Sequence, residues 1–259
     1  MGRLLSLAYG VICYVAFFGT FLYTIGFLAN FGVPKSVDSG TPAPLGETLL
    51  VNLALLGLFA VQHSGMARQG FKRVLTRFVP PPVERSTYVL ASSVVLWALF
   101  AWWRPMPEAL WSFESTAART VGWALYAGGL GLVLYSTFLI DHFDLFGLRQ
   151  VILHWKQSAY SERHFHTPSL YRFVRHPLYV GWFVTFWATP DMTVGHFLLA
   201  AGVTGYILGA IPLEERDLSQ LHGEPYRRWR ALTPKFLPRF GRGGTTGAVP
   251  EAGRIAHSG

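Results

Sequence analysis

Long apolar runs constrain this chain more than any other feature of its sequence. Four of them, at 5–29, 48–66, 87–103 and 120–140, approach the roughly 20 residues that a helix needs to cross a bilayer. Only 14% of the residues are charged, whereas soluble domains carry about 25%. The sequence therefore predicts an all-α, polytopic integral membrane protein.

A fifth apolar run, at 178–211, is too long for one ordinary span. Thr189, Pro190 and Asp191 interrupt it, and a proline beside short polar side chains favours a turn. We therefore expect two antiparallel arms joined at or near the far interface. The predicted fold has about five transmembrane spans, of which the last is this helical hairpin; six helices result if its arms are counted separately.

The chain is expected to fall into three parts. A four-span bundle covers 1–140, and a catalytic and cofactor region covers 141–240. The remainder, 241–259, is glycine-rich and lacks apolar periodicity, which predicts a disordered tail. Within the second part, 218–229 is expected to form a short amphipathic helix, a turn at Gly223 and an aromatic-basic segment.

Basic residues gather in particular loops. The segments 67–86 and 141–177 and the stretch after 215 are rich in Lys and Arg, whereas the loops 31–47 and 104–114 are not. Because basic loops stay in the cytoplasm, we expect an inner (cytoplasmic) membrane protein whose N-terminus and C-terminal region face inward. The net charge of +8 is thereby explained by the lipid bilayer, without a nucleic-acid partner.

The single cysteine, Cys13, lies inside the first apolar run. One cysteine cannot build a disulfide framework, and a small buried hydrophobe is its expected role. The run itself is too long for a signal peptide and lacks the small-residue cleavage pattern, which predicts a retained span.

The hairpin begins with an unusual stretch, YRFVRHPLYVGW at 171–182. Proline is favoured at the first helical position, so we expect Pro177 to begin the first arm, with His176 at its N-cap. The start of a helix attracts anions, and the planar guanidinium of Arg175 suits a carboxylate or a phosphate. The alternative is an interfacial arginine that anchors the helix end to lipid headgroups.

Two acids, Glu214 and Glu215, lie where the second arm returns. Antiparallel arms would bring them beside His176 and Tyr179. An unpaired charge costs on the order of 2–3 kcal/mol toward the bilayer centre, so a pair of acids here needs partners. An anion site that faces two carboxylates suits a zwitterion with an ammonium and a carboxylate, such as an amino-acid moiety.

The order of these motifs resembles a known family. Arg-His-Pro-x-Tyr-x-Gly, a hydrophobic hairpin, Glu-Glu-x-x-Leu and Gly-x-x-Tyr, within 168–237, resemble the integral membrane methyltransferases related to isoprenylcysteine carboxyl methyltransferase. The segments 62–68, 141–150 and 186–196 are similar to the bacterial methanethiol S-methyltransferases, and this likeness extends up to the tail.

The resemblance implies methyl transfer from S-adenosylmethionine to a small volatile thiol, methanethiol, giving dimethyl sulfide. The family's cofactor motif matches seven positions of this sequence: Arg175, His176, Tyr179, Gly181, Glu214, Glu215 and Tyr226. Whether Arg175 meets the cofactor or a headgroup stays open. The glycines of 128–131 lie in mid-span and precede no strand–helix turn, which favours close helix packing.

Activation of the acceptor requires that a thiol lose its proton. Even a cysteine-like thiol, with a pKa of about 8.5, costs roughly 2 kcal/mol to ionise at neutral pH. His63 lies near the inner end of the second run, and His142 and Asp144 follow the fourth; these three are the candidate catalytic residues. A general base that uses a His–Asp couple is favoured. The alternative is a metal held by His63 and residues of 142–166, for which the spacing is a weak signal, and no metal ligand is assigned.

Two other functions fit parts of the pattern. A prenylcysteine or lipid acceptor would use the same cofactor site but would need a groove open to lipid, which Trp182, Phe183, Phe186 and Trp187 could line as well as a closed pocket. A small channel or transporter would place polar residues in mid-membrane at a repeat interface, whereas here they gather at the inner face.

Overall fold

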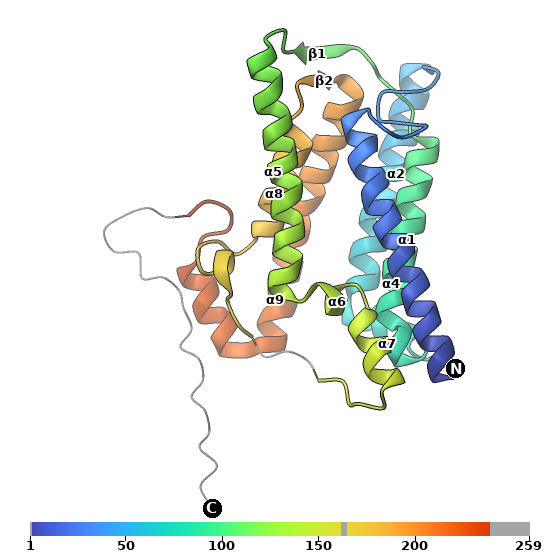
Figure 1. Ribbon diagram of the computed structural model, residues 1–259, viewed down its shortest axis with the longest axis vertical. Helices are drawn as coiled ribbons and strands as arrows, with labels where there is room; N and C mark the ends of the chain where they lie inside the picture. Colours follow the sequence, from blue (N-terminus) through green and yellow to red (C-terminus); the bar gives the residue numbers. More distant parts are fainter. Residues whose placement is uncertain (1, 162–164, 239–259) are drawn as a thin grey trace, which may run out of the picture.

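Long helices run side by side along the molecule (Figure 1). The computed structural model describes residues 2–161 and 165–238, so the predicted tail at 241–259 lies outside the described residues. The long helices are α1 (Arg3–Ala29), α2 (Leu45–Ala67), α4 (Pro81–Trp102), α5 (Thr116–Ile140) and α9 (Val194–Leu232). The shorter elements are α3 (Gln69–Leu75), β1 (Ala109–Ser112), α6 (His142–Leu145), α7 (Leu148–Trp155), η1 (Ser169–Arg172), α8 (Pro177–Trp187) and β2 (Asp191–Thr193).

The predicted all-α membrane fold is confirmed. Four helices of the described chain, α1, α2, α5 and α9, are long and apolar enough to cross a membrane. The remaining predicted span, 87–103, lies almost entirely in α4, which has 22 residues but carries the charged Glu84 and Arg85 near its start. Pro81 stands at the first position of α4, where a proline's missing N–H leaves no bond unmade.

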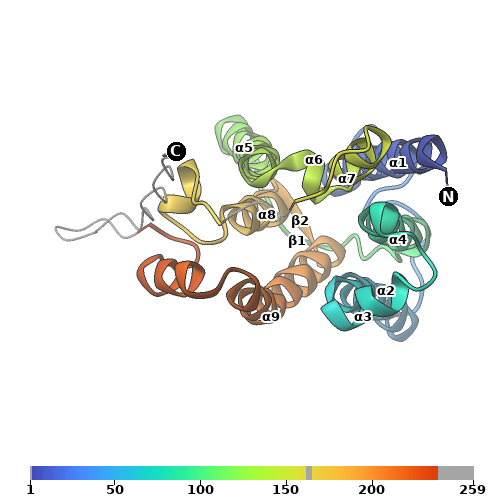
Figure 2. The same cartoon turned by 90° about the horizontal axis from the view of Figure 1, so that it is seen from below.

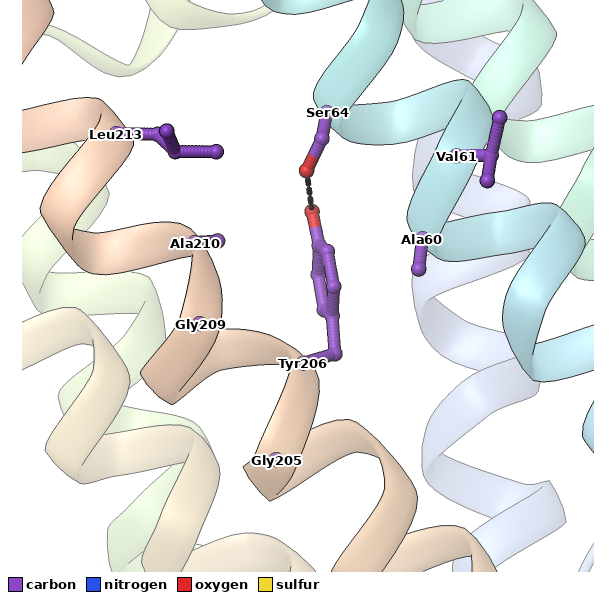
Figure 3. Close-up of a pocket in the computed structure, with 8 residues that line it drawn as sticks. All are labelled: Ala60, Val61, Ser64, Gly205, Tyr206, Gly209, Ala210 and Leu213. Carbon is purple, nitrogen blue, oxygen red and sulfur yellow. Dashed lines mark hydrogen bonds between the residues drawn. The ribbon is translucent and has the colours of Figure 1, made fainter.

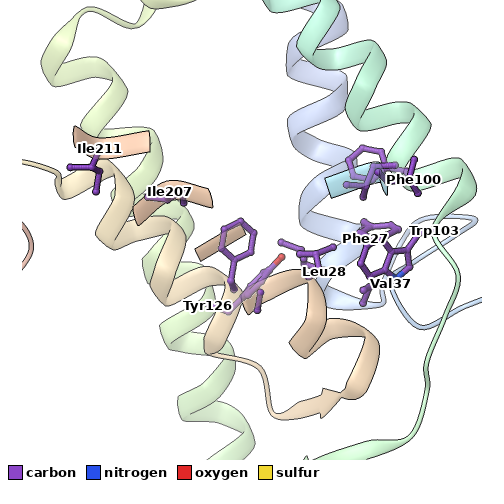
Figure 4. Packing of buried hydrophobic residues seen from close by; sticks show 13 residues of the cluster. Phe27, Leu28, Val37, Phe100, Trp103, Tyr126, Ile207 and Ile211 are labelled. Atoms are coloured by element: carbon purple, nitrogen blue, oxygen red, sulfur yellow. The ribbon is translucent and has the colours of Figure 1, made fainter. Parts of the chain in front are cut away.

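The helices form two groups when the molecule is seen from below (Figure 2). Helices α1, α2 and α4 make one group, and α5, α8 and α9 make the other. A buried apolar cluster joins the groups and includes Leu28 of α1, Phe100 of α4, Tyr126 of α5 and Ile207 of α9 (Figure 4). The Tyr126 hydroxyl also donates to the Ile25 carbonyl at 2.7 Å, which satisfies its buried polar end.

The expected hairpin is present, and its arms differ in length. Helix α8 has 11 residues, which at about 1.5 Å per residue reaches only about half-way through a bilayer. The turn falls at the predicted residues between α8 and α9. There β2 pairs antiparallel with β1, a short ribbon that the sequence did not predict. This pairing ties the α8–α9 turn to the connection between α4 and α5.

The second arm is longer than expected. Helix α9 does not end near Ile211 but continues through Pro212 to Leu232. A proline inside a helix removes one backbone hydrogen bond, and the helix can continue beyond it. The predicted turn at Gly223 is a break within this helix, where φ is 64° and ψ is −138°. Glycine reaches such angles without the steric cost that a side chain would add.

A close contact between glycines fixes α8 against α5. A Cβ on Gly181 would lie 2.8 Å from the Gly129 carbonyl oxygen, and a Cβ on Gly129 would lie 2.6 Å from Thr185 Oγ1. Small residues allow two membrane helices to approach this closely. The expected packing role of the glycines at 128–131 is therefore confirmed for Gly129, and α8 is held at a defined height beside α5.

Candidate functional site

The two arms of the hairpin meet where the sequence predicted. Glu215 Oε1 lies 3.0 Å from His176 Nε2 and 3.2 Å from Arg175 Nη1, and the side chains of all three residues are largely buried. His176 is the residue before Pro177, the first of α8. The start of α8 and the returning α9 are thus joined by a buried, hydrogen-bonded group that pairs a carboxylate with a guanidinium, the arrangement in which a buried carboxylate is tolerated.

The neighbouring acid has a different environment. Glu214 is half-buried, and its Oε2 accepts a hydrogen bond of 2.6 Å from the Tyr179 hydroxyl. The donor to Glu214 is thus a neutral phenol, whereas Glu215 pairs with a guanidinium. Burial, with a smaller contribution from the Glu214 carboxylate, raises the pKa of Tyr171 in η1.

Arg175 has binding capacity left over. Its Nη1 also donates to the Arg230 carbonyl at 3.2 Å, but its Nε is buried and has no hydrogen-bond partner among the described residues. A buried guanidinium N–H without an acceptor is costly. The Arg175 Nε–H is therefore available to an acceptor on a bound ligand.

Tyrosines link the hairpin to the other helix group. Tyr206 of α9 lies 3.1 Å from Ser64 Oγ of α2 through its hydroxyl, and its ring packs edge-to-face on His63, with centroids 6.4 Å apart. Tyr206 and Tyr88 of α4 do not stand in the predicted motif.

His63, a predicted catalytic residue, lies on the same side of the molecule. Its Nε2 is 3.0 Å from the Tyr88 hydroxyl and its Nδ1 is 3.2 Å from Ser92 Oγ. The ring stacks on Phe59 with centroids 5.1 Å apart. The structure thus brings His63 of α2 into contact with Tyr88 of α4 and with the ring of Tyr206 of α9.

Arg85, Tyr88 and Ser92 were missed by sequence reasoning. They follow one another at intervals of three and four residues on α4, which places them on one face of a helix. A stripe of polar residues in an apolar span was the available signal. Its partner on α2 could not be identified without the packing of the two helices.

The predicted couple of His142 and Asp144 is not formed. His142 Nε2 lies 2.8 Å from the Tyr14 hydroxyl and Nδ1 lies 2.8 Å from Thr137 Oγ1, so both ring nitrogens are engaged elsewhere. Asp144 instead pairs with Arg149 at 2.9 Å, which raises the pKa of that guanidinium. Residues two apart on a helical turn point in different directions, which explains why these two side chains do not face each other.

Two further motif residues lie beside the site, each with a packing role. Gly181 faces α5 through the glycine contact described above. Tyr226 is 2% exposed and packs against Phe165 and Trp229, with ring centroids 5.4 Å from each. Their predicted roles at the cofactor stay predictions; the structure gives each a reason to be present in the fold.

A cavity of about 370 Å³ lies between α2 and α9 (Figure 3). Its wall is apolar except for Ser64 and Tyr206, whose hydroxyls are 3.1 Å apart and bridge the two helices. Its other lining residues are Ala60, Val61, Gly205, Gly209, Ala210 and Leu213. Within 2–161 and 165–238, no three His, Cys, Asp or Glu side chains gather as a metal site would require.

Known proteins resemble this chain over almost its whole length. A methanethiol S-methyltransferase of Mycobacterium tuberculosis is 52% identical over 238 residues, which cover 92% of this chain and 98% of that protein. One of Crocosphaera subtropica is 48% identical, with 93% and 95% covered. Nurim of Xenopus laevis is a more distant relative, 26% identical, with 89% of this chain and 85% of Nurim covered.

No family model and no solved structure matches the chain. The bacterial relatives nevertheless decide the family, because they share about half of all residues across nearly the full length of both partners. On that similarity, the chain belongs to the methanethiol S-methyltransferase family of integral membrane proteins.

Proposed function

We propose that this protein transfers a methyl group from S-adenosylmethionine to methanethiol and releases dimethyl sulfide. Relatives that carry this activity in their names share 46–52% of their residues with it. The observation that supports the proposal within the structure is the meeting of the hairpin arms, where Tyr179 reaches Glu214 and His176 reaches Glu215.

The residues at this meeting point suit the methionyl part of the donor. Glu214 would accept hydrogen bonds from its ammonium group, while the free Nε–H of Arg175 would donate to its carboxylate. His176 and Glu215 would hold Arg175 in place, and Tyr179 would orient Glu214. Gly181 and Tyr226 would contribute by fixing α8 and the end of α9. When bound, S-adenosylmethionine supplies an electrophilic methyl group on a positively charged sulfur.

The protein's own contribution to the chemistry lies in ionising and positioning the thiol. We assign the general base to His63, whose ring is held in place from α4. His142 and Asp144 stay candidates from the sequence, with partners of their own. Apolar and aromatic walls would exclude water and strengthen the attraction between the thiolate and the positive donor.

The proposed orientation places this site at the cytoplasmic side of an inner membrane. The N-terminus, α7 and the end of α9 lie at one end of the molecule, and β1 and β2 lie at the other (Figure 1). The described residues of the basic segments, 67–86, 141–161 and 165–177, belong to the first end. This agrees with the positive-inside rule and with a cofactor that arrives from the cytosol. The division into a bundle at 1–140 and a cofactor region at 141–240 stays a prediction; α5, at the end of the first part, packs against α8 of the second.

The decisive experiment uses purified protein in lipid or detergent. Incubation with S-adenosylmethionine and methanethiol is expected to give dimethyl sulfide in the headspace, measured by gas chromatography. Methylation only of a prenylcysteine would contradict the acceptor assignment while keeping the donor. Failure of the protein to bind S-adenosylmethionine, measured by calorimetry, would contradict the proposed function as a whole.

A further inference from the structure

The hydrogen bonds around His63 decide which ring nitrogen is basic. Ser92 Oγ lies 3.2 Å from His63 Nδ1 and 3.1 Å from the carbonyl oxygen of Tyr88. A carbonyl oxygen only accepts, so the single Ser92 hydroxyl proton is directed to it, and Ser92 Oγ accepts from His63 Nδ1–H. Nε2 then carries the lone pair and accepts from the Tyr88 hydroxyl at 3.0 Å.

The opposite tautomer makes poorer bonds. With the proton on Nε2, the Tyr88 hydroxyl would have to donate to the His63 carbonyl oxygen, which lies 3.4 Å away. With the proton on Nδ1, the corresponding bond is the one that Ser92 Oγ donates to the Tyr88 carbonyl oxygen at 3.1 Å. This bond is the stronger of the two, because hydrogen bonds weaken as they lengthen. The geometry therefore favours neutral His63 with its basic nitrogen toward Tyr88.

Tyr88 belongs to an aromatic group that reaches α9. Its hydroxyl bonds His63, and the His63 ring in turn packs edge-to-face on Tyr206 of α9, with ring centroids 6.4 Å apart. The Arg85 guanidinium carbon lies 5.0 Å from the Tyr88 ring centroid, and Arg85 Nε donates to the Leu145 carbonyl at 2.7 Å. A cation over an aromatic ring is attracted to it, which holds the Tyr88 ring in position.

We propose that Tyr88 and His63 form a proton relay that ionises the methyl acceptor, with Ser92 as the residue that positions His63. The inference rests on the proposed function. The S–H bond of the thiol breaks and its electron pair stays on sulfur. The thiol proton passes to Tyr88 Oη while the Tyr88 proton passes to His63 Nε2. The thiolate is then the nucleophile for the methyl group, and the proton later leaves the imidazolium for water, which balances the reaction.

The test compares Tyr88→Phe with two serine variants. Loss of a general acid–base group lowers turnover by about 100-fold or more, so Tyr88→Phe is expected to lower kcat for methanethiol by at least that factor. Its affinity for S-adenosylmethionine should stay within about threefold of the natural protein's, because Tyr88 is not among the groups assigned to the donor. Trifluoroethanethiol, a more acidic small thiol, should recover most of the lost kcat, since it needs less help to ionise.

Ser92→Ala and Ser93→Ala form a matched pair. Both serines are buried, and each returns a hydrogen bond to a carbonyl four residues earlier, but of the two only Ser92 contacts a ring nitrogen of His63. Ser92→Ala should therefore lower kcat by about tenfold and make it more dependent on thiol acidity, whereas Ser93→Ala should change neither.

The possible outcomes distinguish failure of the proton relay from failure of the proposed methyl transfer. If the natural protein makes no dimethyl sulfide, the proposed function fails. If the natural protein is active and Tyr88→Phe keeps full turnover, or loses it equally for both thiols, the relay is overturned. If Tyr88→Phe does not fold, the serine pair decides alone, and equal kcat and thiol dependence in its two variants overturns the relay.

Discussion

At the scale of single residues, the adjacent acids Glu214 and Glu215 have different expected roles. Glu215 neutralises a buried group that contains Arg175, and removal of one partner of a buried ion pair costs about 3–5 kcal/mol. We expect Glu215→Gln to lower the thermal unfolding temperature and to weaken binding of S-adenosylmethionine. Glu214→Gln should weaken binding as strongly but cost less stability, because Glu214 is only half-buried and its bond is to a neutral phenol.

Calorimetric titration and thermal unfolding of both variants in the same detergent check this difference. Tyr179→Phe, which removes the donor to Glu214, should also reduce the affinity. Unchanged affinity in both Glu215→Gln and Tyr179→Phe would show that the donor pocket lies elsewhere.

The two candidate catalytic histidines have different contacts, which predict different effects of their replacement. His63 contacts Tyr88 of α4, whereas His142 bridges Tyr14 of α1 and Thr137 of α5. We expect His63→Ala to lower kcat by about 100-fold with little change in donor affinity. His142→Ala should lower the unfolding temperature and change kcat by less than tenfold. A larger kcat loss in stable His142→Ala protein would return that residue to the chemistry.

The sequence predicted those parts of the site that depend on residues adjacent in the chain, such as helix starts and helix breaks. Pro177 begins α8 and Gly223 breaks α9 because their backbone preferences act on adjacent residues. Glu214 and Glu215 reach α8 because any antiparallel hairpin returns there. Ser92 and Tyr88 were missed because their partner, His63, comes from another helix, and that packing is a tertiary property.

At the scale of elements, the approach of α8 to α5 sets the height of the donor site. A Cβ on Gly181 would lie within 3.0 Å of backbone atoms on α5, and backbone cannot move aside cheaply. We expect Gly181→Ala to lower the unfolding temperature, at a cost of roughly 1–3 kcal/mol, the range for overpacked sites. Donor affinity should fall with it, because α8 carries His176 and Tyr179.

Gly128→Ala is the matched control. Gly128 lies on the same α5 turn as Gly129, but nothing stands within 4 Å of its added Cβ. Replacement of glycine by alanine in an open helical position should leave stability unchanged or raise it by up to about 1 kcal/mol. Equal stability of the two alanine variants would mean that α8 and α5 are not packed as closely as described.

At the scale of the whole molecule, a clasp at the end far from the donor site joins elements distant in sequence. Arg119 of α5 forms two hydrogen bonds with Asp191, at 2.8 and 2.7 Å, and Ser112 of β1 adds a third. The bonds from Arg119 and Ser112 lower the pKa of Asp191 below its ordinary value. Because Asp191 lies in the turn between α8 and α9, we expect the clasp to fix the position of α8 relative to α5.

The depressed pKa fixes the sign of a pH effect. Folding favours ionised Asp191, so the clasp contributes its full stability above the unfolded-state pKa, about 3.9, and loses it as pH falls through the lower, folded-state value. We expect the unfolding temperature of the natural protein to fall more steeply than that of Asp191→Asn as the pH drops below about 4, and the two curves to be parallel near neutrality. Because both side chains are more than one-third exposed, the difference should also shrink in high salt. Parallel curves throughout the acid range would mean that the clasp does not hold the hairpin, and that the glycine contact alone positions α8.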